Sequence, residues 1–278
     1  MWPDGGSDKL TARVLIVDGV DRNRSLLKVG LQSAQFAVSA CATEAEARCA
    51  MARDRPDVVL VNLNDPSQEL HGFCRKLRDS GATDSIALIA VGIPDTAKAR
   101  FAALDAGADD VVVHPVDGSF LTARVRSLLR LRRAVPQDEV RGKYGFEDGR
   151  KGFAAKPRIV VLTATGLHPP EITFGLHERL GCIVERDARA ASPANLTVLV
   201  AADASGLRMQ LSEVRRNAGH GPVLAILPRS VWHDAARCLE LDLQDLCHDG
   251  VTAGELALRA GRLLALRPDR PANAVSAA

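Results

Sequence analysis

The sequence has 278 residues, which suits about two domains at roughly 150 residues per domain. Its 36 lysine and arginine residues nearly balance 34 aspartate and glutamate residues, and the net charge of +2 excludes a strongly basic nucleic-acid-binding composition. Hydrophobic residues at 46% exclude wholesale disorder, and no apolar run is long enough for a membrane helix. The six cysteines form no CxxC pair, so we expect reduced thiols in a cytoplasmic protein without membrane contact.

Short apolar runs alternate with amphipathic stretches through the first half of the chain. We predict strands over 13–18, 36–42, 57–63, 85–91 and 110–114. Segments with apolar residues at helical spacing lie between these strands. The last predicted helix, over 120–133, is basic. Continuous apolar strands that alternate with helices are typical of a parallel sheet covered on both faces.

The same pattern then occurs a second time. The segments 158–164, 196–203 and 255–264 repeat the patterns of 13–19, 58–65 and 120–129. We therefore predict an α/β protein with two tandem (βα)5 units, each a doubly wound parallel sheet. The predicted boundaries are a first unit over 11–133, a linker over 134–156, a second and shortened unit over 157–266, and a flexible tail over 267–278.

Five segments of the first unit carry a family resemblance. They are VLIVDG at 14–19, PDVVLVNLNDP at 56–66, CRKLR at 74–78, LDAGADDVVVHPV at 104–116 and FLTARVRSLLRLRR at 120–133. With these segments the unit resembles the CheY-like receiver domain of two-component response regulators. Two such units in tandem are similar to the N-terminal part of PleD-type regulators, where a diguanylate cyclase domain follows. The sequence has no GGDEF-like segment, and we expect no enzymatic activity.

The receiver resemblance implies a phosphorylation pocket with an acidic pair, an acceptor aspartate, a Thr or Ser, an aromatic residue and a lysine. The residues at these positions, in that order, are Asp18 with Gly19, Asn62, Gly92, Val111 and His114. An amide cannot replace a carboxylate nucleophile, and a single carboxylate is a poor site for Mg²⁺. We therefore expect a vestigial pocket without phosphorylation, metal or cofactor.

Two further positions bear on this expectation. In the second unit, Thr163 and Ala164 stand at the acidic pair and Val200 stands at the acceptor, so that unit departs further from the pattern. In the first unit, Asp65 follows Asn62 by three residues and is a candidate substitute acceptor. The alternative for Asp65 is a loop residue that caps the next helix.

Without phosphorylation chemistry, we expect the protein to act through its surface. The resemblance implies that the fourth helix, the fifth strand and the fifth helix form the contact face. Its candidate residues are Lys98, Arg100, Phe101, Asp109, Asp110, Arg124 and Arg126. The expected function is that of a pseudo-receiver adaptor in a bacterial two-component network, with a link to cyclic-di-GMP signalling left open. Its expected partner is a histidine kinase, a phosphotransfer protein, a cyclase or another regulator, and a homodimer is also left open.

Two other functions remain as alternatives. Gly19 and Gly92 leave space in the pocket, which a small-molecule sensor could use. Basic residues are concentrated in 124–158, so nucleic-acid binding through the helix over 120–133 is the second alternative. A solvated basic face explains the same charges, and nucleic acid is therefore not the expected partner.

Overall fold

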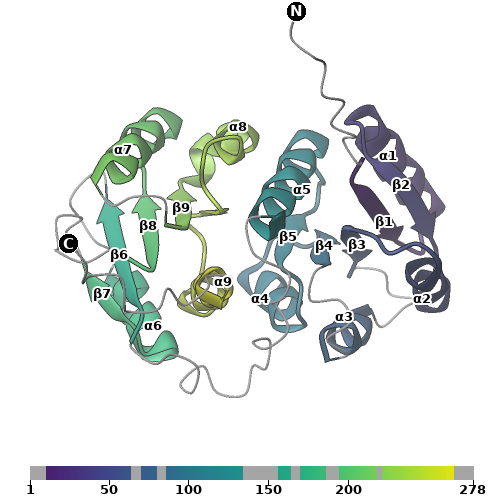
Figure 1. Ribbon diagram of the computed structural model, residues 1–278, viewed down its shortest axis with the longest axis horizontal. Coiled ribbons are helices and arrows are strands. Elements are labelled where there is room, and N and C mark those ends of the chain that lie inside the picture. Colours follow the sequence, from purple (N-terminus) through teal and green to yellow (C-terminus); the bar gives the residue numbers. More distant parts are fainter. Residues whose placement is uncertain are drawn as a thin grey trace, which may run out of the picture.

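The computed structural model describes residues 11–63, 70–79, 86–133, 156–163, 170–185, 194–217 and 221–265. These residues form two parallel five-stranded sheets, each flanked by helices (Figure 1). The predicted fold class, two doubly wound α/β units, is confirmed.

The first unit alternates strands and helices. Its elements are β1 (Arg13–Val17), α1 (Asp21–Ser33), β2 (Ala37–Cys41), α2 (Glu44–Arg53), β3 (Val58–Asn62), α3 (Leu70–Asp79), β4 (Ala87–Ile93), α4 (Ala97–Asp105), β5 (Asp110–Val113) and α5 (Gly118–Arg133). The strand order is β2-β1-β3-β4-β5, and all neighbours are parallel. Every residue of the central strand β3 is buried, because helices cover both faces of the sheet.

The second unit repeats this arrangement. Its elements are β6 (Arg158–Thr163), α6 (Pro170–Leu180), β7 (Ile183–Glu185), β8 (Leu196–Val200), α7 (Ala204–Asn217), β9 (Val223–Leu227), the 3-10 helix η2 (Arg229–Asp234), α8 (Ala235–Leu239), β10 (Asp245–His248) and α9 (Ala253–Ala265). The order β10-β9-β8-β6-β7 is that of the first sheet read from its other edge. The predicted shortening after β7, most of the predicted linker and the predicted tail lie outside the described residues, so the domain boundaries stay predictions.

Each sheet carries an apolar layer on both faces. In the first unit, Phe73 and Leu104 belong to one layer, and Leu31 and Leu121 belong to the other. All four side chains are almost completely buried. This packing holds the carboxyl ends of β1, β3 and β4 together at one edge of the sheet.

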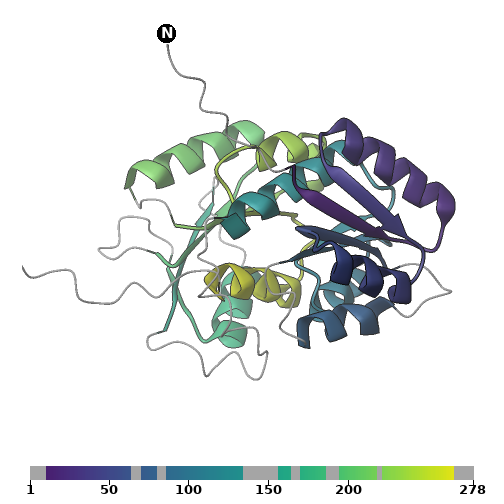
Figure 2. The same ribbon diagram turned by 45° about the vertical axis from the view of Figure 1, so that its right-hand side comes forward.

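The two units pack against each other through corresponding elements. Helix α5 lies along α8, and α4 lies along α9 (Figures 1 and 2). Ala123 of α5 joins an apolar cluster of the second unit, and Leu258 of α9 packs against a cluster of the first. The α4–β5–α5 face of the first unit is therefore an interface within the chain.

A close contact between α6 and α9 gives a stability prediction. A Cβ on Gly175 would lie 2.5 Å from Cβ of Ala253. Gly175→Ala gains roughly 1 kcal/mol of helix propensity but adds overpacking that costs about 1–3 kcal/mol, so we expect a lower free energy of unfolding in urea. The double variant Gly175→Ala with Ala253→Gly should recover most of this loss. If the single variant is more stable than the parent, the close contact is wrong.

Candidate functional site

Three of the predicted pocket residues lie together at the carboxyl edge of the first sheet. Asp18 follows β1, Asn62 ends β3, and Gly92 lies next to the end of β4. These strands are neighbours in the order β1-β3-β4, so their carboxyl ends meet. Asp18 and Asn62 are only 1% and 6% exposed.

The Asn62 side chain binds the Asp18 carboxylate directly. Nδ2 of Asn62 donates a hydrogen bond to Oδ2 of Asp18 over 3.0 Å. The N–H of Val20 donates to Oδ1 of the same carboxylate over 2.8 Å. A buried carboxylate needs such donors, and here both of its oxygens receive them from the protein itself.

Gly92 lies beside the Asn62 side chain and has a backbone conformation that favours glycine. Its φ of +74° coincides with an irregularity in the β4–β5 register between Val91 and Ile93. A Cβ at Gly92 would lie 3.0 Å from Oδ1 of Asn62. A hydroxyl side chain at this position would therefore strain the backbone and displace the amide.

The other predicted pocket positions lie around this contact. Gly19 is exposed and follows Asp18 directly. Val111 is buried in β5, while the exposed His114 follows β5 and precedes Pro115 across a cis peptide bond. Val111 and His114 also line a cavity between the two units. The candidate substitute acceptor, Asp65, lies outside the described residues.

Within the described ranges, no three His, Cys, Asp or Glu side chains are grouped to hold a metal ion. No described helix is long and apolar enough to cross a membrane.

The cysteines offer no activated thiol among the buried positions. Cys49 is exposed and the other five are buried. Burial raises the pKa of Cys41 to about 11 and the pKa of Cys74 to about 12. Both thiols are therefore protonated at neutral pH and serve as small apolar side chains.

Comparison with known proteins now identifies the first unit. Residues 14–126 match the response regulator receiver domain. The chain is 27% identical to the response regulator PleD of Caulobacter vibrioides over 268 residues, which cover 90% of this chain and 58% of PleD. It is 34% identical to the response regulator MprA of Mycolicibacterium vanbaalenii over 129 residues, which cover 46% of this chain and 54% of MprA. The chain thus spans somewhat more than half the length of these relatives.

Solved structures also match part of this chain. A putative response regulator from Chloroflexus aurantiacus is 24% identical to the chain, with a TM-score of 0.41. The match covers 43% of this chain and 98% of that protein. The PleD similarity covers both units, so the predicted resemblance to tandem receivers is confirmed.

The receiver face predicted to bind a partner protein is covered by the chain's own second unit. Arg100, Asp110 and Arg124 are only 3%, 1% and 2% exposed. Arg100 donates from Nε to Glu255 over 3.0 Å and from Nη2 to the carbonyl of Gly250 over 2.8 Å. The prediction of an open contact surface at these three residues is therefore corrected, since they contact α9, β10 and the loop between them.

Four buried charges join the two receiver-like units in a nearly two-fold arrangement. Arg124 contacts Asp110 at 2.5 Å and Asp245 at 2.7 Å. Arg259 contacts the same two carboxylates, at 2.9 Å and 3.1 Å. Asp245 and Arg259 lie 135 residues after Asp110 and Arg124, so each unit supplies one aspartate and one arginine from equivalent positions. We call these four residues the interface charge cluster.

The interface charge cluster shifts the pKa values of its two aspartates in opposite directions. Burial raises the pKa of Asp245, but the guanidinium groups of Arg259 and Arg124 outweigh it and lower that pKa below its usual range. The neighbouring carboxylates raise the pKa of Arg259 well above its usual value against the effect of burial. Burial and the neighbouring Asp245 carboxylate raise the pKa of Asp110, and Arg124 and Arg259 do not fully offset this rise. Asp245 is therefore the carboxylate of the cluster that the guanidinium groups hold in its charged form.

The other four predicted face residues have different surroundings. Asp109 binds Arg78 at 2.6 Å and Arg132 at 2.7 Å within the first unit. Burial opposes ionisation of Asp109, but these guanidinium groups lower its pKa to about 2. Phe101 is half-buried near Gly254 of α9, whose Cβ would lie 3.0 Å from its ring. Lys98 and Arg126 stay exposed.

Proposed function

We propose that this protein is a pseudo-receiver signalling protein that works by protein contacts without being phosphorylated. The observation that carries the proposal is the hydrogen bond from Asn62, at the acceptor position, to the remaining carboxylate of Asp18. Phosphoryl transfer to a receiver requires a carboxylate nucleophile and a bound cation. The amide of Asn62 supplies neither the charge nor the free lone pair.

The surroundings of Asn62 support the same proposal. Gly92 carries no hydroxyl, and His114 replaces the lysine ammonium that would bind a phosphoryl group as a point charge. In the buried interface between the units, Arg100, Asp110 and Arg124 pair with charged groups of the chain itself. These internal ion pairs support a constitutively paired arrangement.

The similarity to response regulators also suggests which classes of protein the proposed partner belongs to. Response regulators work in two-component signalling, so a histidine kinase, a phosphotransfer protein, a cyclase or another regulator is the proposed partner. A link to cyclic-di-GMP signalling and a cytoplasmic location belong to the same proposal. The partner would bind outside the α4–β5–α5 face, because the second unit covers that face.

The arginines of α5 do not favour the nucleic-acid alternative. Arg124 is buried in the interface charge cluster. Arg130 donates to the carbonyl of Leu239 over 2.7 Å, and Arg132 binds Asp109. Three arginines of the basic helix are therefore engaged with groups of the protein itself.

Phosphorylation is tested with the full chain, Mg²⁺ and acetyl phosphate, followed by intact mass spectrometry. A phosphorylatable receiver domain treated in parallel serves as the positive control. We expect no phosphoryl adduct on this chain. An adduct that disappears in the Asp65→Asn variant would assign phosphorylation to Asp65 and overturn the proposal, and an adduct on any other residue of the first unit would do the same.

A further inference from the structure

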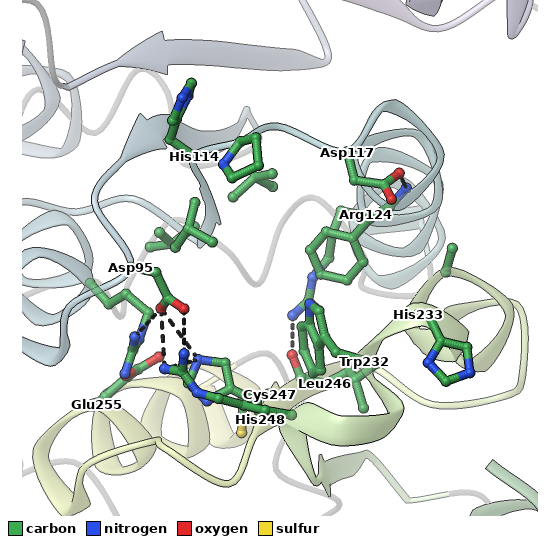
Figure 3. Close-up of a pocket in the computed structure, with 18 of the residues that line it drawn as sticks. Asp95, His114, Asp117, Arg124, Trp232, His233, Leu246, Cys247, His248 and Glu255 are labelled. Atoms are coloured by element: carbon green, nitrogen blue, oxygen red, sulfur yellow. Dashed lines mark hydrogen bonds and ion pairs between the residues drawn. The ribbon is translucent and has the colours of Figure 1, made fainter. Parts of the chain in front are cut away.

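A cavity of about 330 Å³ lies between the two receiver-like units. The end of β5 and α5 line it from the first unit, and η2, α8 and β10 line it from the second (Figure 3). Ligand pockets commonly have volumes of roughly 300–1,000 Å³ and often lie at domain interfaces. The cavity is therefore large enough for a small organic molecule.

Aromatic rings form one side of this cavity. The ring centroids of Phe120 and Trp232 lie 5.4 Å apart, and Trp232 meets the His248 ring edge-on at 5.6 Å. Trp232 is half-buried, and its indole N–H has no acceptor among the described residues. This side thus offers a stacking surface and one hydrogen-bond donor to a flat ring.

Paired charges form the other side. Figure 3 shows Asp95 and Glu255 across the opening from Trp232 and Arg124. Asp95 binds Arg100 at 2.5 Å and Arg229 at 2.6 Å, so one carboxylate serves two guanidinium groups. Arg100 has a second carboxylate partner, Glu255, while the Arg229 side chain pairs with Asp95. The Arg229 side chain is 50% exposed and is therefore accessible to a ligand.

The His248 ring adds a second donor beside Arg229. Its Nδ1 accepts a hydrogen bond from the N–H of Gly250 over 2.9 Å, which leaves the proton of a neutral ring on Nε2. Nε2 lies 3.3 Å from Nη2 of Arg229 and 3.6 Å from Oδ1 of Asp95. The Nε2–H of His248 and Nη2 of Arg229 are thus two neighbouring donors. Oδ1 of Asp95 lies beyond hydrogen-bond distance of Nε2.

The guanidinium groups at this side act on both titratable neighbours. Burial and then Arg100 and Arg229 lower the pKa of His248, while Asp95 and Glu255 act in the opposite direction. Burial raises the pKa of Asp95, but Arg229 and Arg100 outweigh it and lower that pKa. The half-exposed Arg229 is therefore the guanidinium that a ligand carboxylate can share with Asp95.

We propose that this cavity binds a small flat aromatic carboxylate. Its ring lies against Phe120 and Trp232, and its carboxylate accepts hydrogen bonds from Arg229 and His248. Such a ligand contacts both units, so its binding stabilises their pairing by mass action. The site differs from the Asp18–Asn62 pocket and does not depend on whether that pocket is phosphorylated.

Trp232 supplies the reporter for a binding test. The chain contains two tryptophans, and Trp2→Phe leaves Trp232 as the source of the single indole N–H resonance. The probe is 2-naphthoate, titrated into the ¹⁵N-labelled full chain that carries Trp2→Phe, with 2-naphthamide as the uncharged control. We expect a saturable shift of the indole resonance with 2-naphthoate and at least about tenfold weaker binding of 2-naphthamide.

Two arginine variants locate the carboxylate. Arg229→Gln should weaken 2-naphthoate binding by about tenfold, because a charged donor is lost. Arg237→Gln, at an arginine of α8 whose side chain is 78% exposed and outside the cavity lining, should leave binding unchanged. The proposal is overturned if the indole resonance of the folded protein does not respond to the probe. It is also overturned if the amide binds as well as the carboxylate, or if Arg229→Gln keeps the parent affinity.

Discussion

Arg259→Met should lower the free energy of unfolding of the full chain by about 3–5 kcal/mol, because it leaves buried charges uncompensated. Arg259 contacts Asp110, Asp245 and Glu255, and all three residues are less than one-tenth exposed. Methionine fills a similar volume but provides no positive charge. Urea unfolding monitored by circular dichroism measures the loss.

The pH dependence separates lost charge from lost packing. The pKa of Asp110 already lies above its usual range in the parent because of burial, whereas that of Asp245 is lowered by Arg259 and Arg124. Loss of Arg259 should raise the folded-state pKa of Asp110 further and raise that of Asp245 above the value of unfolded aspartate. A buried carboxyl group with a raised pKa destabilises the folded state when it ionises. The free energy of unfolding is therefore retained at low pH and falls as pH rises through the folded-state pKa. The deficit of Arg259→Met relative to the parent should therefore grow between about pH 5 and pH 8.

Arg126→Met is the matched control, since Arg126 is an exposed arginine on α5. It should change the free energy of unfolding by no more than about 0.5 kcal/mol. A deficit for Arg259→Met that does not change with pH, or that is no larger than that of the control, would contradict the interface charge cluster.

Asn62→Asp should destabilise the protein by about 1–3 kcal/mol at pH 8 in the absence of divalent ions. The substitution removes the Nδ2 donor that lies 3.0 Å from Asp18 and places a second carboxylate there. Like charges raise the folded-state pKa of this pair, so stability is lost as pH rises through that pKa. Two carboxylates can also hold Mg²⁺, so millimolar Mg²⁺ should restore part of the thermal stability of the variant but not alter the parent.

The double variant Asp18→Asn with Asn62→Asp keeps one carboxylate and one amide in the contact. It should recover most of the thermal stability without Mg²⁺, because an amide again donates to a carboxylate. If Asn62→Asp melts at the parent temperature at pH 8 and gains nothing from Mg²⁺, the Asp18–Asn62 contact does not set the chemistry of this pocket.

The central strands β1, β3, β6 and β8 could be predicted because they are continuous apolar runs that the helices bury. The short edge strand β7 carries no such run, since its three residues are exposed or half-buried. The sequence is less informative about strand ends: its apolar run predicts a strand over 85–91, whereas β4 spans Ala87–Ile93. The strand continues past Gly92, whose positive φ accommodates an irregularity in the ladder. Sequence spacing identifies the glycine but does not specify that conformation.

The sequence predicts which residues lie together in the pocket, but it does not predict which residues the interface buries. Asp18, Asn62 and Gly92 could be placed together because parallel strands bring their carboxyl ends to one edge. Burial of Arg100 and Arg124 could not be predicted from one unit, because it depends on which surface the second unit covers. The sequence did hold a signal: Asp245 and Arg259 repeat Asp110 and Arg124 at the same spacing. Identical charges at equivalent positions are the pattern expected for a nearly two-fold interface.

The distance between the units with and without a phosphoryl mimic tests the central claim most directly. Cys49 of α2 is exposed while the other cysteines are buried, and Met209→Cys adds a second labelling site on α7, where Met209 is 73% exposed. Pulsed electron paramagnetic resonance on the doubly spin-labelled full chain then reports the distance across the paired units. We predict one narrow distance distribution that does not change when Mg²⁺ and beryllofluoride are added. A broad distribution, or one that shifts with beryllofluoride, would contradict a constitutively paired, phosphorylation-independent protein.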